Sequence, residues 1–101
     1  MTNVRTATDP IVILGKRGVH DQAVRKAMLE VDRAHFAPPE DALLAPEDLP
    51  ISVSEGHSLI APGALAVLLE ALSIVSGSKV LIVGAGTGYV AAVAARIAAD
   101  V

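Results

Sequence analysis

A short apolar run that enters a glycine-rich turn constrains the fold of this chain more than any other feature. The run is Lys79-Val80-Leu81-Ile82-Val83, the turn is Gly84-Ala85-Gly86-Thr87-Gly88, and an alanine-rich stretch follows from Tyr89 to about Ala99. This order is typical of the start of a β-α-β unit. We therefore expect residues 80–83 to form a central parallel strand, with the glycines at its C-terminal end and a helix from about Tyr89 packed on its sheet.

The spacing of the three glycines restricts the kinds of ligand that this turn can bind. Glycine permits a tight turn with positive φ and lets a ligand approach the backbone closely. A dinucleotide fingerprint needs Gly-x-Gly-x-x-Gly and a P-loop needs Gly-Lys-Ser/Thr, whereas here the glycines stand at 84, 86 and 88. The spacing is similar to motif I of class I methyltransferases, in which the loop passes beneath S-adenosylmethionine. A glycine-rich turn without a ligand is the alternative, and a nicotinamide oxidoreductase is disfavoured.

Upstream of this unit, the sequence predicts two helices separated by a proline-rich segment. Asp21 is an N-cap candidate for an amphipathic helix, whose apolar positions are Val24, Ala27, Met28 and Val31. Prolines at 38, 39, 46 and 50 forbid a long helix between residues 32 and 50. Residues 51–60 are expected to form a loop or an irregular strand. Pro62 suits the first turn of a second helix, expected from Gly63 to about Ile74. This helix is apolar almost all round apart from Glu70, so we expect it to be buried on several sides.

These elements divide the chain into an N-terminal segment (1–17), a helical and loop region (18–75) and the start of a Rossmann-like domain (76–101). The predicted fold class is α/β: the beginning of a doubly wound parallel sheet, incomplete, with an N-terminal helical and loop extension. The second strand of the β-α-β unit would begin near Val101, where the sequence ends.

The composition excludes several classes of function. The chain has 101 residues, a net charge of −3 and no cluster of Lys and Arg, so nucleic acid is not an expected partner. It has no cysteine, which excludes disulfides and thiolate metal sites, and we expect no bound metal. Polar residues interrupt the apolar stretches well short of a membrane span, and the N-terminus does not resemble a signal peptide. We therefore expect a cytoplasmic protein that does not contact a membrane.

Four blocks of sequence resemble one methyltransferase family. The run Gly88-Tyr89-Val90-Ala91-Ala92-Val93 is similar to the Gly-Tyr-Gln-Ala-Ala-Val of protein-L-isoaspartate O-methyltransferases. The run from Ala27 to Pro38 resembles that family's Ala-Met-x-x-Val-Pro-Arg-x-x-Phe-Val-Pro. Leu49-Pro50-Ile51 and Ala61-Pro62 match two further blocks in the right order. The likeness runs from about Gly18 to the last residue.

The resemblance implies an activity and a cofactor. Members of this family transfer a methyl group from S-adenosylmethionine to isoaspartyl carboxylates in damaged proteins, so isoaspartyl peptides or proteins are the implied partners. The implied cofactor loop consists of Gly84, Ala85, Gly86, Thr87, Gly88 and Tyr89. The acidic residue that would hold the ribose hydroxyls belongs after the second strand, beyond Val101.

Two positions depart from the family's pattern. The family's substrate-contacting serine aligns with Ile60, which cannot donate a hydrogen bond to a carboxylate. Ser54, His57 or Ser58 of the same loop would have to supply the donor. Motif I normally places an acidic residue at Ile82, where it helps to hold the cationic methionine end of the cofactor. We therefore expect weak cofactor binding and little activity of this chain alone.

The sequence leaves two functions open. The first is an isoaspartyl methyltransferase or a divergent relative, which the intact loop from Gly84 to Tyr89 favours. The second is a catalytically degenerate family member that acts as a non-catalytic accessory subunit, with a protein partner covering its open sheet. Ile60 and Ile82 favour the second function.

Overall fold

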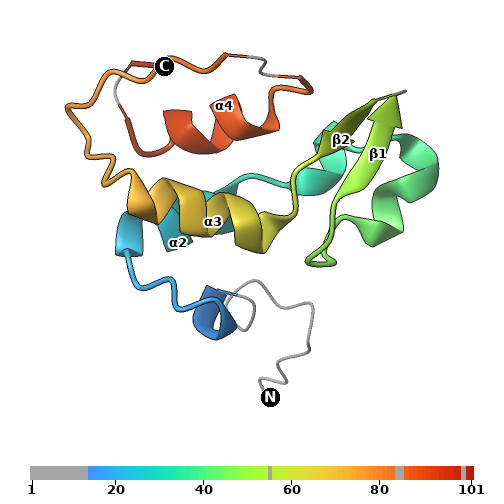
Figure 1. The fold of residues 1–101 in the computed structure, drawn as a ribbon, viewed down its shortest axis with the longest axis horizontal. Coiled ribbons are helices and arrows are strands. Elements are labelled where there is room, and N and C mark those ends of the chain that lie inside the picture. Colours follow the sequence, from blue (N-terminus) through green and yellow to red (C-terminus); the bar gives the residue numbers. More distant parts are fainter. Residues whose placement is uncertain (1–13, 55, 84–85, 99) are drawn as a thin grey trace.

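α-Helices and a short β-hairpin build the part of the chain that the computed structural model describes, which is residues 14–54, 56–83, 86–98 and 100–101. α2 packs against both α3 and α4, and the hairpin stands at the end of the molecule where α3 begins (Figure 1). In chain order the elements, with η for a 3-10 helix, are α2 (Gln22–Glu30), η1 (Arg33–Phe36), η2 (Pro39–Leu44), β1 (Ile51–Ser54), β2 (His57–Leu59), α3 (Pro62–Ala71) and α4 (Tyr89–Ala95).

α2 confirms the predicted amphipathic helix. The carboxylate of Asp21 accepts the backbone N–H groups of Ala23 at 2.9 Å and of Val24 at 3.2 Å, and it thereby caps the helix. Val24, Ala27 and Met28 are buried on one face of the helix, as the spacing of the apolar residues predicts.

α3 begins at Pro62, one residue before the predicted start at Gly63, and it ends at Ala71 rather than near Ile74. Its N-cap residue, Ala61, has no side chain that can accept a hydrogen bond. The carboxylate of Asp48 takes over this role by accepting the backbone N–H of Gly63 at 2.8 Å. The cap of α3 therefore comes from the proline-rich segment and not from the residue that precedes the helix.

The segment before α3 forms short turns and a hairpin. The prolines confine residues 33–44 to the two 3-10 helices, in agreement with the prediction that no long helix forms there. Residues 51–60 contain the antiparallel pair β1–β2, in which Ile51 lies opposite Leu59 and Ser52 opposite Ser58. Ile51 and Leu59 are buried, whereas Ser52 and Ser58 are exposed, so the hairpin packs one face on the core.

The prediction of a central strand at residues 80–83 is wrong for the described part of the chain. The pairing found there is a single parallel bridge between Lys79 and Asp100, with the N–H of Val80 donating to the carbonyl of Asp100 at 2.8 Å. Leu81 and Val83 are 88% and 89% exposed. A parallel strand needs neighbours that bind its backbone and cover both its faces, and in the described ranges Asp100 alone pairs with this run.

α4 begins at Tyr89, as predicted, but ends at Ala95 rather than near Ala99, and it packs against α2 rather than on a sheet. The expected doubly wound parallel sheet is thus not present in the described residues, whose paired strands are those of the antiparallel hairpin.

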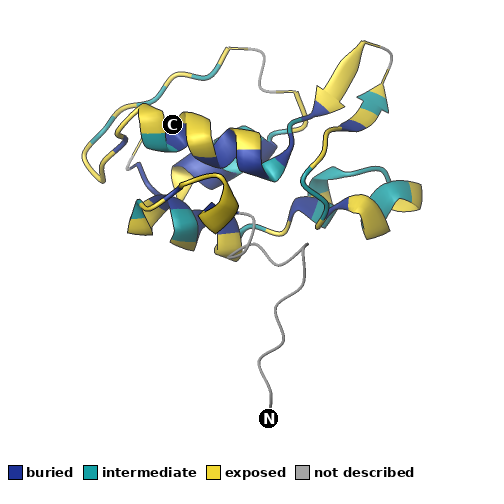
Figure 2. Ribbon diagram, turned by 60° about the horizontal axis from the view of Figure 1, so that its bottom comes forward, coloured by how far each residue is buried: buried dark blue, intermediate teal, exposed yellow. Residues whose placement is uncertain are grey.

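The apolar core lies between the facing sides of the helices and the base of the hairpin (Figure 2). α3 was expected to be buried on several sides, yet Val67 and Leu68 are 42% and 47% exposed on its outer side. No helix in the described ranges is long and apolar enough to cross a lipid bilayer. The largest fully buried side chains are those of Tyr89, Leu14, Leu65, Val19, Val24 and Val93.

Candidate functional site

The hairpin and the end of the glycine-rich turn line one cavity of about 640 Å³. It brings together the predicted substrate residues His57, Ser58 and Ile60 with Gly86, Thr87 and Tyr89 of the predicted cofactor loop. Ser54 also lines it, whereas Gly88 does not. Gly84 and Ala85, the first two residues of the predicted loop, lie outside the described residues. Two segments roughly thirty residues apart in sequence thus line the same cavity.

The glycine side of the cavity has the backbone conformation for which glycine is suited. Gly86 has a φ of 59° and Gly88 a φ of 90°, both in the left-handed region. The N–H of Tyr89 donates to the hydroxyl oxygen of Thr87 at 3.3 Å, which fixes the entry into α4. The described part of this loop therefore requires glycine for its turn, as its sequence predicts.

The hairpin side carries the polar groups of the cavity. Ser54, His57 and Ser58 are exposed on β1 and β2. Ile60, at the position of the family's substrate serine, is half-buried and packs its side chain against the core. The hydroxyl and imidazole groups of this hairpin can donate hydrogen bonds to a carboxylate, whereas the side chain of Ile60 cannot.

Tyr89 links the cavity to the core. Only 2% of this residue is exposed, and its ring lies 5.5 Å from the ring of Phe36 at an interplanar angle of 52°. Burial raises the pKa of the Tyr89 hydroxyl to about 12, against a smaller lowering by the charge of Arg33. Tyr89 is therefore neutral at physiological pH, and it acts as an apolar wall of the site with a single polar tip.

Arg33 is a residue of this region that sequence reasoning did not single out. It is only 4% exposed, and its guanidinium group donates to backbone carbonyls on both sides of the hairpin and in the proline-rich segment. Burial lowers its pKa, while Tyr89 and Asp48 act in the opposite direction. Two signals were available: Arg33 matches the arginine of the family block that begins at Ala27, and it stands between an amphipathic helix and a proline-rich segment, whose bent backbone leaves carbonyls in need of donors.

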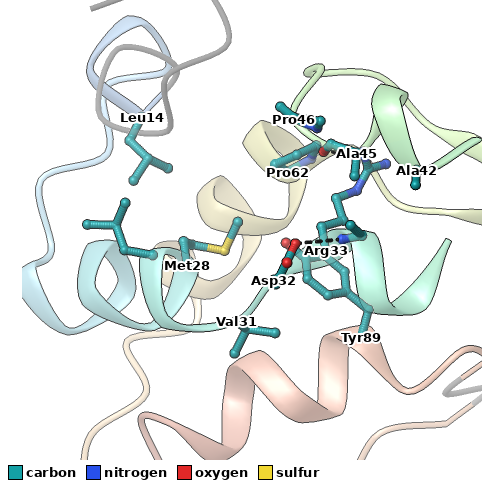
Figure 3. A pocket seen from close by; sticks show the side chains of 12 residues that line it. Leu14, Met28, Val31, Asp32, Arg33, Ala42, Ala45, Pro46, Pro62 and Tyr89 are labelled. Atoms are coloured by element: carbon teal, nitrogen blue, oxygen red, sulfur yellow. Dashed lines mark hydrogen bonds between the residues drawn. The ribbon is translucent and has the colours of Figure 1, made fainter.

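A second cavity, of about 490 Å³, shares Tyr89 with the first cavity and is also lined by Arg33 (Figure 3). Figure 3 shows Tyr89 of α4 beside Asp32 and Arg33, with apolar side chains such as Met28 and Pro62 around them. Of the described residues of the predicted cofactor loop, Tyr89 alone lines this second cavity. In the described ranges, no three His, Cys, Asp or Glu side chains come together in a way that could hold a metal ion.

Comparison with known proteins identifies the family. Residues 6–101 match the family described as protein-L-isoaspartate(D-aspartate) O-methyltransferase. The chain belongs to this family. Its resemblance to protein-L-isoaspartate O-methyltransferases is thereby confirmed, and with it a relationship to the class I methyltransferases, which use S-adenosylmethionine.

Individual isoaspartyl methyltransferases show the extent of the match. The chain is 43% identical to the protein-L-isoaspartate O-methyltransferase of Gloeobacter violaceus over 88 residues, which cover 87% of this chain and 43% of the relative. It is 40% identical to that of Anaeromyxobacter dehalogenans over 88 residues, which cover 87% and 42%. For Roseiflexus castenholzii the identity is 38% over 100 residues, covering 99% and 45%. The chain thus spans about two fifths of the length of these relatives.

The comparisons support the enzyme family and give no support to the accessory-subunit alternative. The roles of Ser54, His57, Ser58, Ile60 and the glycine loop stay predictions, to which the structure adds the shared cavity.

Proposed function

We propose that this chain carries the substrate hairpin and the cofactor loop of a protein-L-isoaspartate O-methyltransferase, which methylates isoaspartyl carboxylates in damaged proteins. The supporting observation is the shared cavity, to which the hairpin contributes Ser54, His57 and Ser58 and the glycine turn contributes Gly86 and Thr87. A methyl-transfer site needs acceptor and donor held face to face, and a cavity lined by both expected binding elements supports the proposal.

The lining of the cavity fits S-adenosylmethionine in size and in its glycine turn. A volume of about 640 Å³ lies within the range of roughly 300–1,000 Å³ that is usual for small-molecule sites. Gly86 has a positive φ and no Cβ, so a ligand can approach its backbone closely. The described lining contains no acidic side chain, and Ile82 supplies none in the adjoining run. We therefore infer that the cationic end of the cofactor is held more weakly here, by about tenfold for one lost charge-assisted hydrogen bond.

Methyl transfer depends mainly on the alignment of the reacting atoms. When bound, S-adenosylmethionine would supply an electrophilic methyl group for transfer from its sulfur to an isoaspartyl carboxylate oxygen, which would give a methyl ester and S-adenosylhomocysteine. An in-line displacement of this kind needs no general acid or base, but it needs the oxygen, carbon and sulfur in one line. Ser58, which lines the cavity from β2 directly before the buried Leu59, has a hydroxyl that can donate a hydrogen bond to the substrate carboxylate. The half-buried Ile60 contributes an apolar wall instead of a donor.

The exposed apolar run after Lys79 fits the same proposal. Its single bridge to Asp100 is parallel, which is the direction expected in the sheet of a class I methyltransferase. We infer that Leu81 and Val83, nearly fully exposed here, are core positions of that sheet when further strands or a protein partner cover them.

The test is a pair of measurements on the same protein. Calorimetric titration with S-adenosylhomocysteine should detect binding at one site, and tritiated S-adenosylmethionine should label an isoaspartyl peptide but not the matched aspartyl peptide. Because Ile60 and Ile82 weaken both binding steps, we expect slow transfer by this chain. Absence of binding would overturn the proposal, as would equal labelling of the two peptides.

A further inference from the structure

The guanidinium of Arg33 ties together the two arms of the hairpin. Its Nη2 donates to the carbonyl of Leu49, just before β1, at 2.7 Å. The same nitrogen donates to the carbonyls of Leu59 and Ile60, at the end of β2, at 3.3 and 3.0 Å. One nitrogen thus closes the base of the hairpin, next to the strand position of Ser58.

The other terminal nitrogen fixes the hairpin to the proline-rich segment. Nη1 donates to the carbonyls of Ala45 and Glu47 at 3.0 and 3.3 Å. In the described chain no carboxylate lies within ion-pair distance of Arg33, so its partners are backbone carbonyls. The planar fork of arginine presents donors in two separate directions, and the single ammonium of lysine does not.

The short helix η1 that carries Arg33 also touches the other side of the site. Phe36, three residues later on η1, packs its ring against Tyr89, the first residue of α4 after the glycine turn. A Cβ on Gly88 would lie 4.0 Å from the ring of Phe36, so the turn itself is at contact distance from η1. Hence η1 stands between the two binding elements, with Arg33 on the hairpin side and Phe36 on the glycine side.

We propose that Arg33 is a positioning residue, which sets the distance and orientation of the substrate hairpin relative to the glycine loop. This inference rests on the proposed function. Arg33 holds the carbonyls of Leu59 and Ile60, and it thereby fixes the position of Ser58, which precedes them on the hairpin. In a displacement that depends on alignment, a shift of about 1 Å in such an element lowers the rate by about a hundredfold.

The test is an NMR titration of the ¹⁵N-labelled chain, first with S-adenosylhomocysteine and then with an isoaspartyl peptide. For Arg33→Lys we expect an unchanged affinity for S-adenosylhomocysteine, within about twofold, and a peptide affinity weaker by about tenfold, because only the hairpin loses its support. Amide hydrogen exchange at Ser52 and Ser58 should become faster, while exchange at Val24 in α2 stays unchanged. The control is Arg25→Lys on α2, which should alter none of these quantities.

The possible outcomes separate the two proposals. If the wild-type chain binds neither ligand, the proposed function fails, and the positioning role fails with it. If the wild type binds both ligands and Arg33→Lys changes neither the peptide affinity nor the exchange at Ser58, only the positioning role is wrong. A loss of both affinities in Arg33→Lys, together with faster exchange at Val24, would show a general structural role and would also contradict it. Arg33→Met, which removes all five hydrogen bonds, should give a larger loss of peptide affinity than Arg33→Lys.

Discussion

The carboxylate of Glu70 accepts the backbone N–H of Asp21 at 2.8 Å, so the last turn of α3 is bonded to the start of α2. The same oxygen accepts the N–H of His20 at 2.6 Å. Asp21 in turn uses its own side chain to cap α2. Two carboxylates therefore satisfy the backbone donors around this helix start, which lack partners within the helix.

Removing the Glu70 carboxylate should destabilise the protein measurably. In Glu70→Ala the N–H groups of His20 and Asp21 lose their acceptor, and we expect the free energy of unfolding to fall by about 1–3 kcal/mol. Urea denaturation followed by circular dichroism measures this change. Glu40→Ala, at an exposed position of η2, is the control and should change stability by less than about 0.5 kcal/mol. Equal effects of the two substitutions would contradict the assigned role of Glu70.

Gly63 should not tolerate a side chain. A Cβ at this position would lie 2.6 Å and 2.7 Å from the carboxylate oxygens of Asp48 and 2.8 Å from Nε of Arg17. The carboxylate would have to move and give up its bond to the Gly63 N–H, so we expect Gly63→Ala to cost about 1–2 kcal/mol of stability. Gly77→Ala is the matched control, because nothing lies within 4 Å of its Cβ position. Thermal unfolding of both variants gives the comparison, and an unchanged melting temperature of Gly63→Ala would refute the expectation.

The stability of the protein should fall at high pH because of Tyr89. Burial raises the pKa of the Tyr89 hydroxyl in the folded protein to about 12, from its ordinary value of 10.0 in the unfolded chain, so the contribution of the neutral phenol to stability is fully present below about pH 10. This contribution, about 2–3 kcal/mol for a buried group with such a shift, is lost as the pH rises from about 10 to 12. Tyr89 is the single tyrosine of the chain, so absorbance at 295 nm follows its ionisation directly. Tyr89→Phe should keep the ring packing on Phe36 and remove the loss of stability between about pH 10 and 12. If the Tyr89 phenol of the folded protein ionises near pH 10, the prediction is wrong.

Gly86→Val should abolish binding of S-adenosylhomocysteine. Valine is strained at a φ of 59°, and its side chain would enter the cavity that the ligand is expected to occupy. Gly18→Val is the control, because Gly18 has a similar φ of 74° but does not line the cavity. Calorimetry should find ligand binding in the control and none in Gly86→Val. Equal affinities in the two variants would mean that the loop is only a turn.

Introducing the family's residues at positions 60 and 82 should raise the rate of methyl transfer. Ile60→Ser adds a hydroxyl at the position of the family's substrate serine, and Ile82→Glu adds the missing negative charge beside the cofactor loop. We expect each to increase transfer of tritiated methyl groups to an isoaspartyl peptide by about tenfold. Ile60→Ala, which shortens the side chain without adding a donor, is the control for Ile60→Ser. No gain from the double variant would show that this alignment of the hairpin is wrong.

The sequence by itself determined the elements whose signals are local. The N-cap at Asp21 and the spacing of Val24, Ala27 and Met28 predicted α2, because both signals act within a few residues of the helix. Pro62 marked the start of α3, and the glycines before Tyr89 marked the start of α4. The family resemblance was likewise present in the order of the sequence blocks, and the match over residues 6–101 confirms it.

Tertiary structure decided everything that depends on partners distant in sequence. The apolar run at 80–83 has strand propensity, but a strand exists only when neighbouring backbone pairs with it, and in the described chain it meets Asp100 alone. Arg33 finds its carbonyls 12 to 27 residues away, and Asp21 finds Glu70 49 residues away, so no local pattern marks either contact. The hairpin and the glycine turn share a cavity for the same reason: packing around η1 brings them together, and packing is a property of the folded chain as a whole.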